Sequence, residues 1–297
     1  MIDNNKIFMC LSSKLVSSVV EPLNTKEFLE LTEKLASSNR ALNDLSRLSD
    51  YEFTELLGYP ITEANRIRLL LKREDKLNYY LRMINEKGVY VVTYLDRLYP
   101  KAIKEVLKEK APAMFYYAGN LELLNKRLVG FTGSRDANEL DKIYAETQVD
   151  HLIKCGYNVV TGGANGIDKI ASNRAIFDGG SSVEFLSGAL LTRANDYTIL
   201  DALREGRMLL ISSEIPNATF DIISAIDRNK YIYISSCATV VIKTGLKMGG
   251  TWSGAMEALN KGYGKVLCWD NFQYEGNQEL IKNGANKVGY LLDTKLL

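Results

Sequence analysis

The spacing of hydrophobic and polar positions changes near residue 88 and divides the chain into two parts. Before that point apolar residues recur three or four positions apart, the spacing of one helix face. The helical patterns cover Thr25–Ala36, residues 41–58 and residues 65–88. The last two end at Gly58 and Gly88, and glycine commonly ends a helix. These patterns predict a small all-helical N-terminal domain over residues 1–95.

After residue 88, short runs rich in apolar and β-branched residues alternate with helical patterns. The runs are Val89–Thr93, Leu128–Thr132, Tyr157–Thr161, Ser182–Leu186, Met208–Ser212, Ala238–Lys243 and Lys265–Trp269. Strands that alternate with helices favour βαβ units and a parallel sheet. The runs are continuously apolar, as strands covered on both faces are. Residues 96–297 are therefore predicted to form a Rossmann-like α/β domain.

Composition places the 297-residue chain among soluble globular proteins, with 46% hydrophobic and 25% charged residues. The formal net charge is only +1, so no global attraction draws the chain to nucleic acid. A polyanion would have to be held by a local cluster of cations and backbone N–H groups. The N-terminus is a poor signal peptide because Ser12, Ser13 and Lys14 interrupt its apolar run. No run reaches the roughly 20 apolar residues of a membrane span, so we expect a cytoplasmic protein.

The residues that bind metals are few and scattered. The cysteines are Cys10, Cys155, Cys237 and Cys268, and His151 is the single histidine. This spacing predicts neither a metal site nor a disulfide framework. His151 falls in a helical pattern and shares a face with Tyr144, so a packed or surface-bonded role is favoured over catalysis.

The first chemistry-bearing motif is the strand-turn-helix pattern of residues 128–138. An apolar strand ends at Gly133-Ser134-Arg135, and Asn138 with Asp141 predicts the start of a helix. Helix N-termini at the carboxyl ends of parallel strands present free N–H groups to anions. Arg135 adds a planar cation suited to phosphate. The alternative is an ordinary tight turn with Arg135 in solvent.

A second Gly-rich turn follows the next strand, as Thr161-Gly162-Gly163-Ala164-Asn165-Gly166. Three glycines in five residues favour a row of inward N–H groups that suits an anion. The turn matches neither the dinucleotide fingerprint nor a Walker loop, so no cofactor is expected. Asp168 at the following helix start is expected to brace the loop rather than touch a ligand.

Two later motifs could add to the same surface. Arg228-Asn229-Lys230 precedes Tyr231 and Tyr233, a combination suited to phosphate contact and base stacking. The alternative is a solvated helix end with the tyrosines in the core.

Gly249-Gly250-Thr251 follows a strand and could supply further N–H and O–H donors. Trp252 beside it is expected to pack against the loop rather than stack on a base.

Taken in order, these motifs resemble the DNA-processing protein A family, also called DprA or Smf. The resemblance rests on Tyr99-Pro100, Ala111-Pro112, Gly119-Asn120, Gly133-Ser134-Arg135, Thr161 to Asp168, Ser213-Glu214-Ile215-Pro216, Arg228-Asn229-Lys230, Gly249-Gly250-Thr251 and Gly284-Ala285. It implies an extended Rossmann-like, mostly parallel sheet with a small helical N-terminal domain. It also implies single-stranded DNA binding in a positive pocket, a homodimer and the loading of a RecA-type recombinase during DNA uptake.

The resemblance assigns DNA-binding positions residue by residue. The set is Gly133, Ser134, Arg135, Thr161, Gly162, Gly163, Asn165, Gly166, Arg228, Asn229, Lys230, Gly250 and Thr251. The chain departs from the family pattern, with Ala171-Ser172 in place of Ala-His, Ala225-Ile226 in place of Phe-Pro, and Thr192 to Asn195 in place of a Tyr-Pro segment. It also ends near residue 297, without the winged-helix tail of many members. A divergent member is therefore expected.

A binder is favoured over an enzyme, with two alternatives left open. Gly249 to Ser253 with Glu257 resembles the turn of Rossmann-like proteins that cleave nucleoside monophosphates. The carboxylate is one residue out of register, which turns it by about 100° around a helix. Asp168 and Glu214 are other candidate bases. The remaining alternative is a module that only binds a mononucleotide or a cyclic signal.

Overall fold

The computed structural model describes residues 4–297, which form two compact units that divide between Phe115 and Tyr116. The first unit extends past residue 95 because the following segment packs on the N-terminal helices. The Thr25 hydroxyl donates to the carbonyl of Ala111 at 2.6 Å, and the N–H of Tyr94 donates to the carbonyl of Ala113 at 2.9 Å. The domain boundary between residues 95 and 96, which was placed from the change in hydrophobic spacing, stays a prediction.

The first unit is mainly helical. Its elements are α1 (Asn4–Ser12), α2 (Thr25–Ser37), η1 (Leu42–Asp44), η2 (Glu52–Leu56), α3 (Ile61–Leu71), α4 (Glu74–Asn85), β1 (Tyr90–Thr93), α5 (Lys101–Leu107) and η3 (Lys108–Lys110). The helix predicted over Thr25–Ala36 is confirmed, and Asn24 caps it through a reciprocal contact with Glu27. Phe8, Phe28 and Phe53 are fully buried in the core of this unit.

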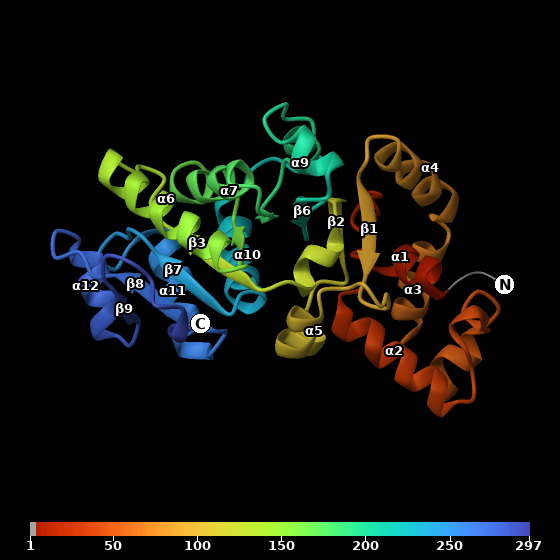
Figure 1. The fold of residues 1–297 in the computed structure, drawn as a ribbon. Helices are drawn as coiled ribbons and strands as arrows, with labels where there is room; N and C mark the ends of the chain where they lie inside the picture. The colour runs from red at the N-terminus through yellow and green to blue at the C-terminus, as the bar shows by residue number, and fades with distance from the viewer. Residues whose placement is uncertain (1–3) are drawn as a thin grey trace. The chain divides into compact units, whose positions relative to one another are not determined.

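The second unit alternates strands and helices, as Figure 1 shows. Its elements are β2 (Met114–Gly119), which begins in the first unit, η4 (Leu121–Asn125), β3 (Leu128–Thr132), α6 (Glu139–Lys154), β4 (Asn158–Thr161), α7 (Ile167–Phe177), β5 (Ser182–Leu186), α8 (Leu190–Ala194), α9 (Leu200–Arg204), β6 (Met208–Ser212), α10 (Ile222–Ser235), β7 (Ala238–Val241), α11 (Gly249–Lys261), β8 (Lys265–Trp269), α12 (Glu275–Lys282), β9 (Asn286–Val288) and η5 (Thr294–Leu296). No helix in residues 4–297 is both long enough and apolar enough to span a membrane.

The strands form one sheet in the order β1-β2-β6-β5-β4-β3-β7-β8-β9. Strand β2 pairs antiparallel with β6, and the pairings from β6 through to β9 are parallel. The predicted α/β fold with a Rossmann-like, mostly parallel sheet is therefore confirmed.

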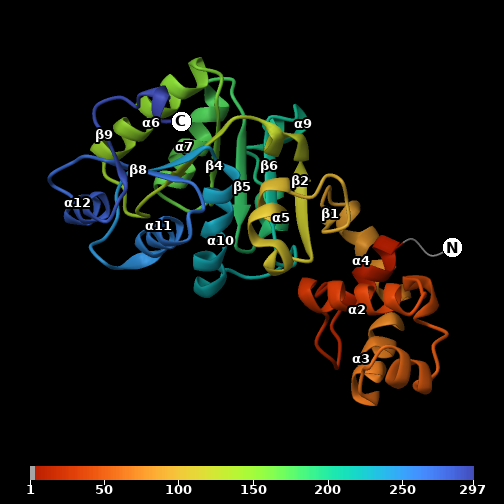
Figure 2. The ribbon, with the colours of Figure 1, turned by 90° about the horizontal axis from the view of Figure 1, so that it is seen from below.

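Helices cover both faces of this sheet, which explains why its strands are continuously apolar. Figure 2 shows α6 and α7 on one side of the strands and α10 and α11 on the other. Phe131 and Val240 pack with the side chains of α6 and α7. Val241 and Val266 point to the opposite face of the sheet, because successive side chains of a strand alternate between its two faces. They pack against α11.

The order of the strands reverses at β3. From β3 the chain proceeds to β4, β5 and β6 on one side, and later returns to β7, β8 and β9 on the other. Ligands of open α/β sheets bind outside the carboxyl ends of strands at such a switch point. The corners after β3, β4 and β7 meet this condition, and they carry the Gly-rich motifs.

Candidate functional site

Two adjoining cavities lie at the switch point, and the predicted motifs supply much of their walls. The first cavity has a volume of about 460 Å³ and the second about 630 Å³. Of the predicted positions, the first is lined by Gly133, Ser134, Arg135, Arg228, Asn229, Gly250 and Thr251. The second is lined by Arg135, Gly162, Gly163, Asn165 and Arg228. The corners after β3, β4 and β7 therefore converge.

Hydrogen bonds fix these corners to one another. The Thr251 hydroxyl donates to the carbonyl of Gly133, and the Asn229 side chain donates to the carbonyl of Gly250, both at 3.1 Å. The N–H of Ile167, at the start of α7, reaches the carbonyl of Ser134 at 3.3 Å. The corner after β3 thus contacts both neighbouring corners directly.

Two glycines permit approaches that a side chain would block. A Cβ at Gly162 would lie 1.4 Å from Nη1 of Arg228, so the guanidinium occupies the space beside this residue. Gly166 has a φ of +85°, and a Cβ there would lie 2.3 Å from the carbonyl oxygen of Ser134. Glycine at these positions lets the two turns and Arg228 pack together.

Arg228 contributes a buried cation that borders both cavities. Its exposed fraction is 6%, and its Nε and Nη1 have no hydrogen-bond partner among residues 4–297. Burial lowers the pKa of Arg228, and the negative charges of Asp168 and Glu184 oppose that effect. A buried guanidinium is unfavourable without negative charge beside it, and an anion in either cavity would add to that of Asp168 and Glu184.

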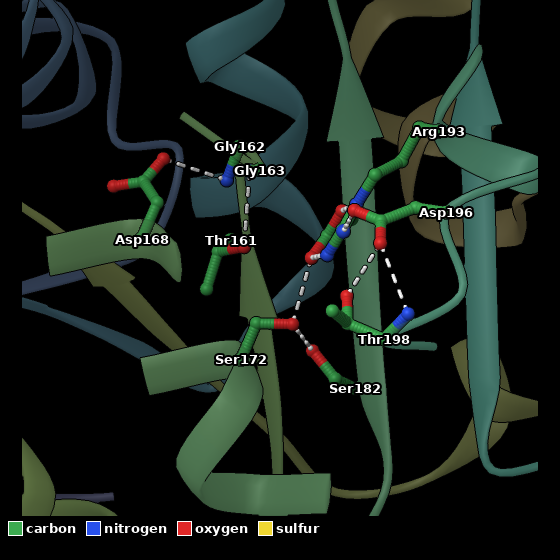
Figure 3. A network of polar contacts seen from close by, with 10 residues as sticks. Thr161, Gly162, Gly163, Asp168, Ser172, Ser182, Arg193, Asp196 and Thr198 are labelled. Atoms are coloured by element: carbon green, nitrogen blue, oxygen red, sulfur yellow. Dashed lines mark hydrogen bonds and ion pairs between the residues drawn. The ribbon is translucent and has the colours of Figure 1, made fainter. Parts of the chain in front are cut away.

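Asp168 braces the second Gly-rich turn, which confirms the role expected of it. Its carboxylate accepts a hydrogen bond from the N–H of Gly162 at 3.0 Å, as Figure 3 shows. Burial raises the pKa of Asp168 to about 6, and the nearby charge of Arg228 acts in the opposite direction. Asp168 also borders the first cavity, beside the arginine.

Arg135 is exposed at the junction of the two cavities, and its guanidinium lies 4.8 Å from the centre of the Phe220 ring. No carboxylate of residues 4–297 lies within ion-pair distance of it.

Lys230 differs from Arg135, because its ammonium contacts Asp227 at 2.5 Å and it lines neither cavity. Gly166 and Thr161 also line neither cavity. The Thr161 hydroxyl accepts a hydrogen bond from the N–H of Gly163 within the turn.

A buried polar network beside the second cavity was not predicted from the sequence. Glu184 is fully buried, and its carboxylate receives two hydrogen bonds from Arg193 at 2.8 and 2.9 Å and one from Ser172 at 2.8 Å. Arg193 also contacts Asp196 at 2.6 Å (Figure 3). A glutamate within an otherwise apolar strand was the signal that could have revealed the network.

Several other candidates lie away from the cavities. Tyr231 and Tyr233 are buried in the interior. They are therefore core residues, which was the alternative to base stacking. Trp252 packs, as expected, rather than lining a cavity, but against the core cluster that includes Val266 and Leu280 instead of its own loop. Glu257 contacts Lys261 at 2.8 Å on α11 and borders neither cavity. Among residues 4–297, no three side chains of histidine, cysteine, aspartate or glutamate gather as metal ligands.

Comparison with known proteins yields matches over most of the chain. The sequence model of the family described as DNA recombination-mediator protein A matches residues 90–294. DNA processing protein DprA of Bacillus subtilis is 25% identical over 224 residues, which are 72% of each chain.

Solved structures resemble the chain in fold. DNA processing protein A from Streptococcus pneumoniae gives a TM-score of 0.62 at 19% identity, and the match covers 90% of this chain and 95% of that one. A second match is DNA processing protein A from Helicobacter pylori, whose structure was described for its single-stranded DNA binding mode. Its TM-score is 0.57 at 23% identity, and the match covers 67% of this chain and 90% of that one.

Proposed function

The chain belongs to the DNA recombination-mediator protein A family, and from this premise we propose that it binds single-stranded DNA through the phosphate backbone. The resemblance to the DNA-processing protein A family seen in the motifs is confirmed by the family match. The family is described as a recombination mediator, and this role favours a protein that binds DNA over one that catalyses a reaction.

One observation carries the proposal, namely the guanidinium of Arg228, a buried cation that borders both cavities. A phosphodiester supplies the negative charge that such a cation attracts, and acceptor oxygens for guanidinium N–H groups. The exposed Arg135 adds a second cation close by. The turns at Gly133 and Gly250 bring backbone to the same wall.

We propose the whole predicted set as the DNA interface, with different roles for its members. Residues that line the cavities contact the backbone directly. Thr161 and Gly166 shape the turns. Lys230 follows Asn229 on α10, and we propose that its ammonium exchanges Asp227 for a phosphate of the strand.

Further partners follow from the family and form part of the proposal. We propose a homodimer that assists the loading of a RecA-type recombinase on incoming DNA, in natural transformation and recombination. Light scattering measures the oligomeric state. A recombinase assay on DNA coated with a single-strand binding protein measures loading.

The decisive experiment is a titration with oligo-dT across a series of salt concentrations, with a mononucleotide as competitor. A backbone binder loses affinity as salt increases, because bound cations are released from the strand. A mononucleotide should then compete poorly. Tight mononucleotide binding with little salt dependence would contradict the proposal, and release of free base would favour the nucleoside-monophosphate-hydrolysing alternative.

A further inference from the structure

We propose that Lys243 is a further phosphate-binding residue of the first cavity. The inference rests on the proposed function and deepens it, because Lys243 lies outside the glycine-rich motifs and outside the predicted DNA-binding set. It concerns the corner after β7, which contacts the turn at Gly133-Ser134-Arg135.

Lys243 lies at the carboxyl end of the sheet, and the backbone holds it against the neighbouring corner. Its carbonyl accepts a hydrogen bond from the N–H of Ser134 at 2.9 Å. The residue lines the first cavity but not the second, and 25% of its side chain is exposed. Its ammonium is therefore partly accessible to a ligand in the first cavity.

Two acceptors hold the ammonium without using all of its donors. Nζ donates to the carbonyl of Asp136 at 3.1 Å and to the carboxylate of Asp141 at 3.2 Å. It also lies 5.2 Å from the centre of the Tyr274 ring, which attracts a cation. An ammonium has three N–H groups, and residues 4–297 supply no third acceptor for this one. One donor is therefore left for a phosphate oxygen.

The carboxylate of Asp141 does not depend on Lys243 alone. Asp141 is fully buried, and it accepts hydrogen bonds from the N–H of Asn138 at 2.9 Å and from the Tyr274 hydroxyl at 2.5 Å. Burial, and then the hydrogen bond to Asp141, raise the pKa of Tyr274, so the phenol keeps the proton that it donates. Asp141 also lies in the first turn of α6, where a negative charge is favourable. Lys243 can therefore contact a phosphate as well without leaving this carboxylate unsatisfied.

The ammonium is also positioned before a strand arrives. Because Asp136 and Asp141 already restrain it, contact with a phosphate costs less side-chain entropy than it would for a free lysine. Asp141 itself borders neither cavity, so its charge does not face the ligand. The first cavity is thus lined by three cations, which are Arg135, Arg228 and Lys243.

The test separates contact with phosphate from a purely structural role. Lys243→Met alone would leave the buried carboxylate of Asp141 without its cation, which destabilises the fold. The comparison is therefore between Asp141→Asn and the double variant Asp141→Asn/Lys243→Met, since neither leaves that charge unpaired. Both are titrated with oligo-dT across a series of salt concentrations, and urea unfolding checks that both fold.

Relative to Asp141→Asn, the double variant should bind oligo-dT about 10- to 100-fold more weakly, through the loss of a charge-assisted hydrogen bond. The slope of log affinity against log salt should fall in magnitude by about 0.7, as one phosphate contact fewer on a single strand predicts. Lys261→Met in the same Asp141→Asn background is the matched control. Lys261 pairs with Glu257 at 2.8 Å and borders neither cavity, so this variant should keep the affinity and the slope of Asp141→Asn.

A second measurement uses the unsubstituted chain and needs no variant. Lysines are acetylated by a small reagent with and without oligo-dT, and mass spectrometry measures the modification of each. The strand should protect Lys243 several-fold and leave Lys261 as reactive as before.

Three outcomes would overturn the inference while leaving the proposed function intact. The first is equal affinity of Asp141→Asn and the double variant. The second is a loss of affinity with an unchanged salt slope, which would show that Lys243 only supports the fold. The third is equal acetylation of Lys243 with and without the strand. If the unsubstituted chain does not bind oligo-dT at all, the proposed function itself fails.

Discussion

The guanidinium groups of Arg228 and Arg135 differ in their surroundings, and the proposed contacts with phosphate should differ accordingly. Arg228 is buried and lacks partners for two nitrogens, so its desolvation is already complete when a ligand arrives. Arg135 is exposed, and a phosphate must compete with water for it. We expect Arg228 to fix the geometry of the site and Arg135 to add affinity.

At this scale we predict that Arg135→Ala weakens oligo-dT binding by about 1–3 kcal/mol through the loss of a charge-assisted contact. Fluorescence anisotropy at fixed salt measures the change. Arg204→Ala is the control, because the Arg204 side chain is 74% exposed and borders neither cavity. Unchanged affinity in the Arg135 variant would remove this residue from the interface.

Asp168 is expected to make DNA binding dependent on pH. Its pKa is raised from 3.8 to about 6 by burial, so the folded free protein binds this proton more tightly than the unfolded chain does. The free energy of unfolding therefore decreases as pH rises between these two values. A phosphate beside Asp168 raises that pKa further, because like charges repel.

Binding of DNA should consequently take up a proton at Asp168, with Arg228 and Glu184 as the neighbouring charges. We predict an affinity gain of about 3- to 10-fold as pH falls from about 8 to about 6. Titration calorimetry in buffers of different ionisation enthalpy measures the proton uptake. Asp168→Asn should abolish the effect, and a pH profile unaltered by that substitution would contradict the assignment.

Among the elements, α10 shows why a sequence motif and a surface cluster differ. Arg228, Asn229 and Lys230 are consecutive, and on a helix each position turns by about 100° from the last. Arg228 and Asn229 therefore reach the cavities, while Lys230 lies beside Asp227. The same geometry turns Tyr231 and Tyr233 toward the interior.

The corners after β3 and β4 depend on the close approach at Gly166. Gly166→Ala should lower the free energy of unfolding by about 2–4 kcal/mol, because positive φ and the contact with Ser134 both oppose a side chain. Chemical denaturation measures this. Gly179→Ala is the comparison, since Gly179 has a φ of +78° and open space around it. Equal losses at the two positions would show that the contact between corners contributes nothing.

The network around β5 predicts a second effect on stability. Arg193→Leu leaves the buried carboxylate of Glu184 without its cation and should cost about 3–5 kcal/mol. The exposed pair of Arg204 and Asp201 provides the contrast, and Arg204→Leu should change stability by less than about 1 kcal/mol. Thermal and urea unfolding of both variants test the difference, and a small loss in the Arg193 variant would argue against a buried ion pair.

Much of the α/β unit could be predicted because its strands are continuous apolar runs. The bounds of β3, β5, β6 and β8 match the predicted ranges. Strand β2 was not among the predicted runs, although Phe115, Tyr116 and Tyr117 are residue types that favour strands. Only its antiparallel pairing with the distant β6 lacks a signal in the sequence. Strand β9 has three residues, too few to show a period.

The site could be predicted in part for a related reason. Glycine-rich turns mark the corners in the sequence, so Gly133, Gly162 and Gly250 were found. Phe220, Tyr197 and Arg193 were not, because they lie on segments without a motif and reach the second cavity only through the fold. The sequence shows which turns can approach an anion, but it does not show which side chains the topology brings beside them.

For the whole molecule, the net charge of +1 limits long-range attraction, so affinity depends on a few local contacts. We predict a plot of log affinity against log salt with a slope of about −1.5 to −2, as expected for two or three phosphates on a single strand. Arg135→Ala should reduce the magnitude of this slope by about 0.7. A much steeper slope would indicate an extended basic surface beyond the two cavities.

The central position of β3 in the sheet has a consequence for synthesis. This strand pairs with β4, which follows closely in the chain, and with β7, which begins more than 100 residues later. A nascent chain that has emerged only through β6 holds the first two Gly-rich turns but lacks α10 and the turn at Gly250. The ability to bind single-stranded DNA should therefore arise late in translation, after α11 leaves the ribosome. Unfinished chains should not bind DNA.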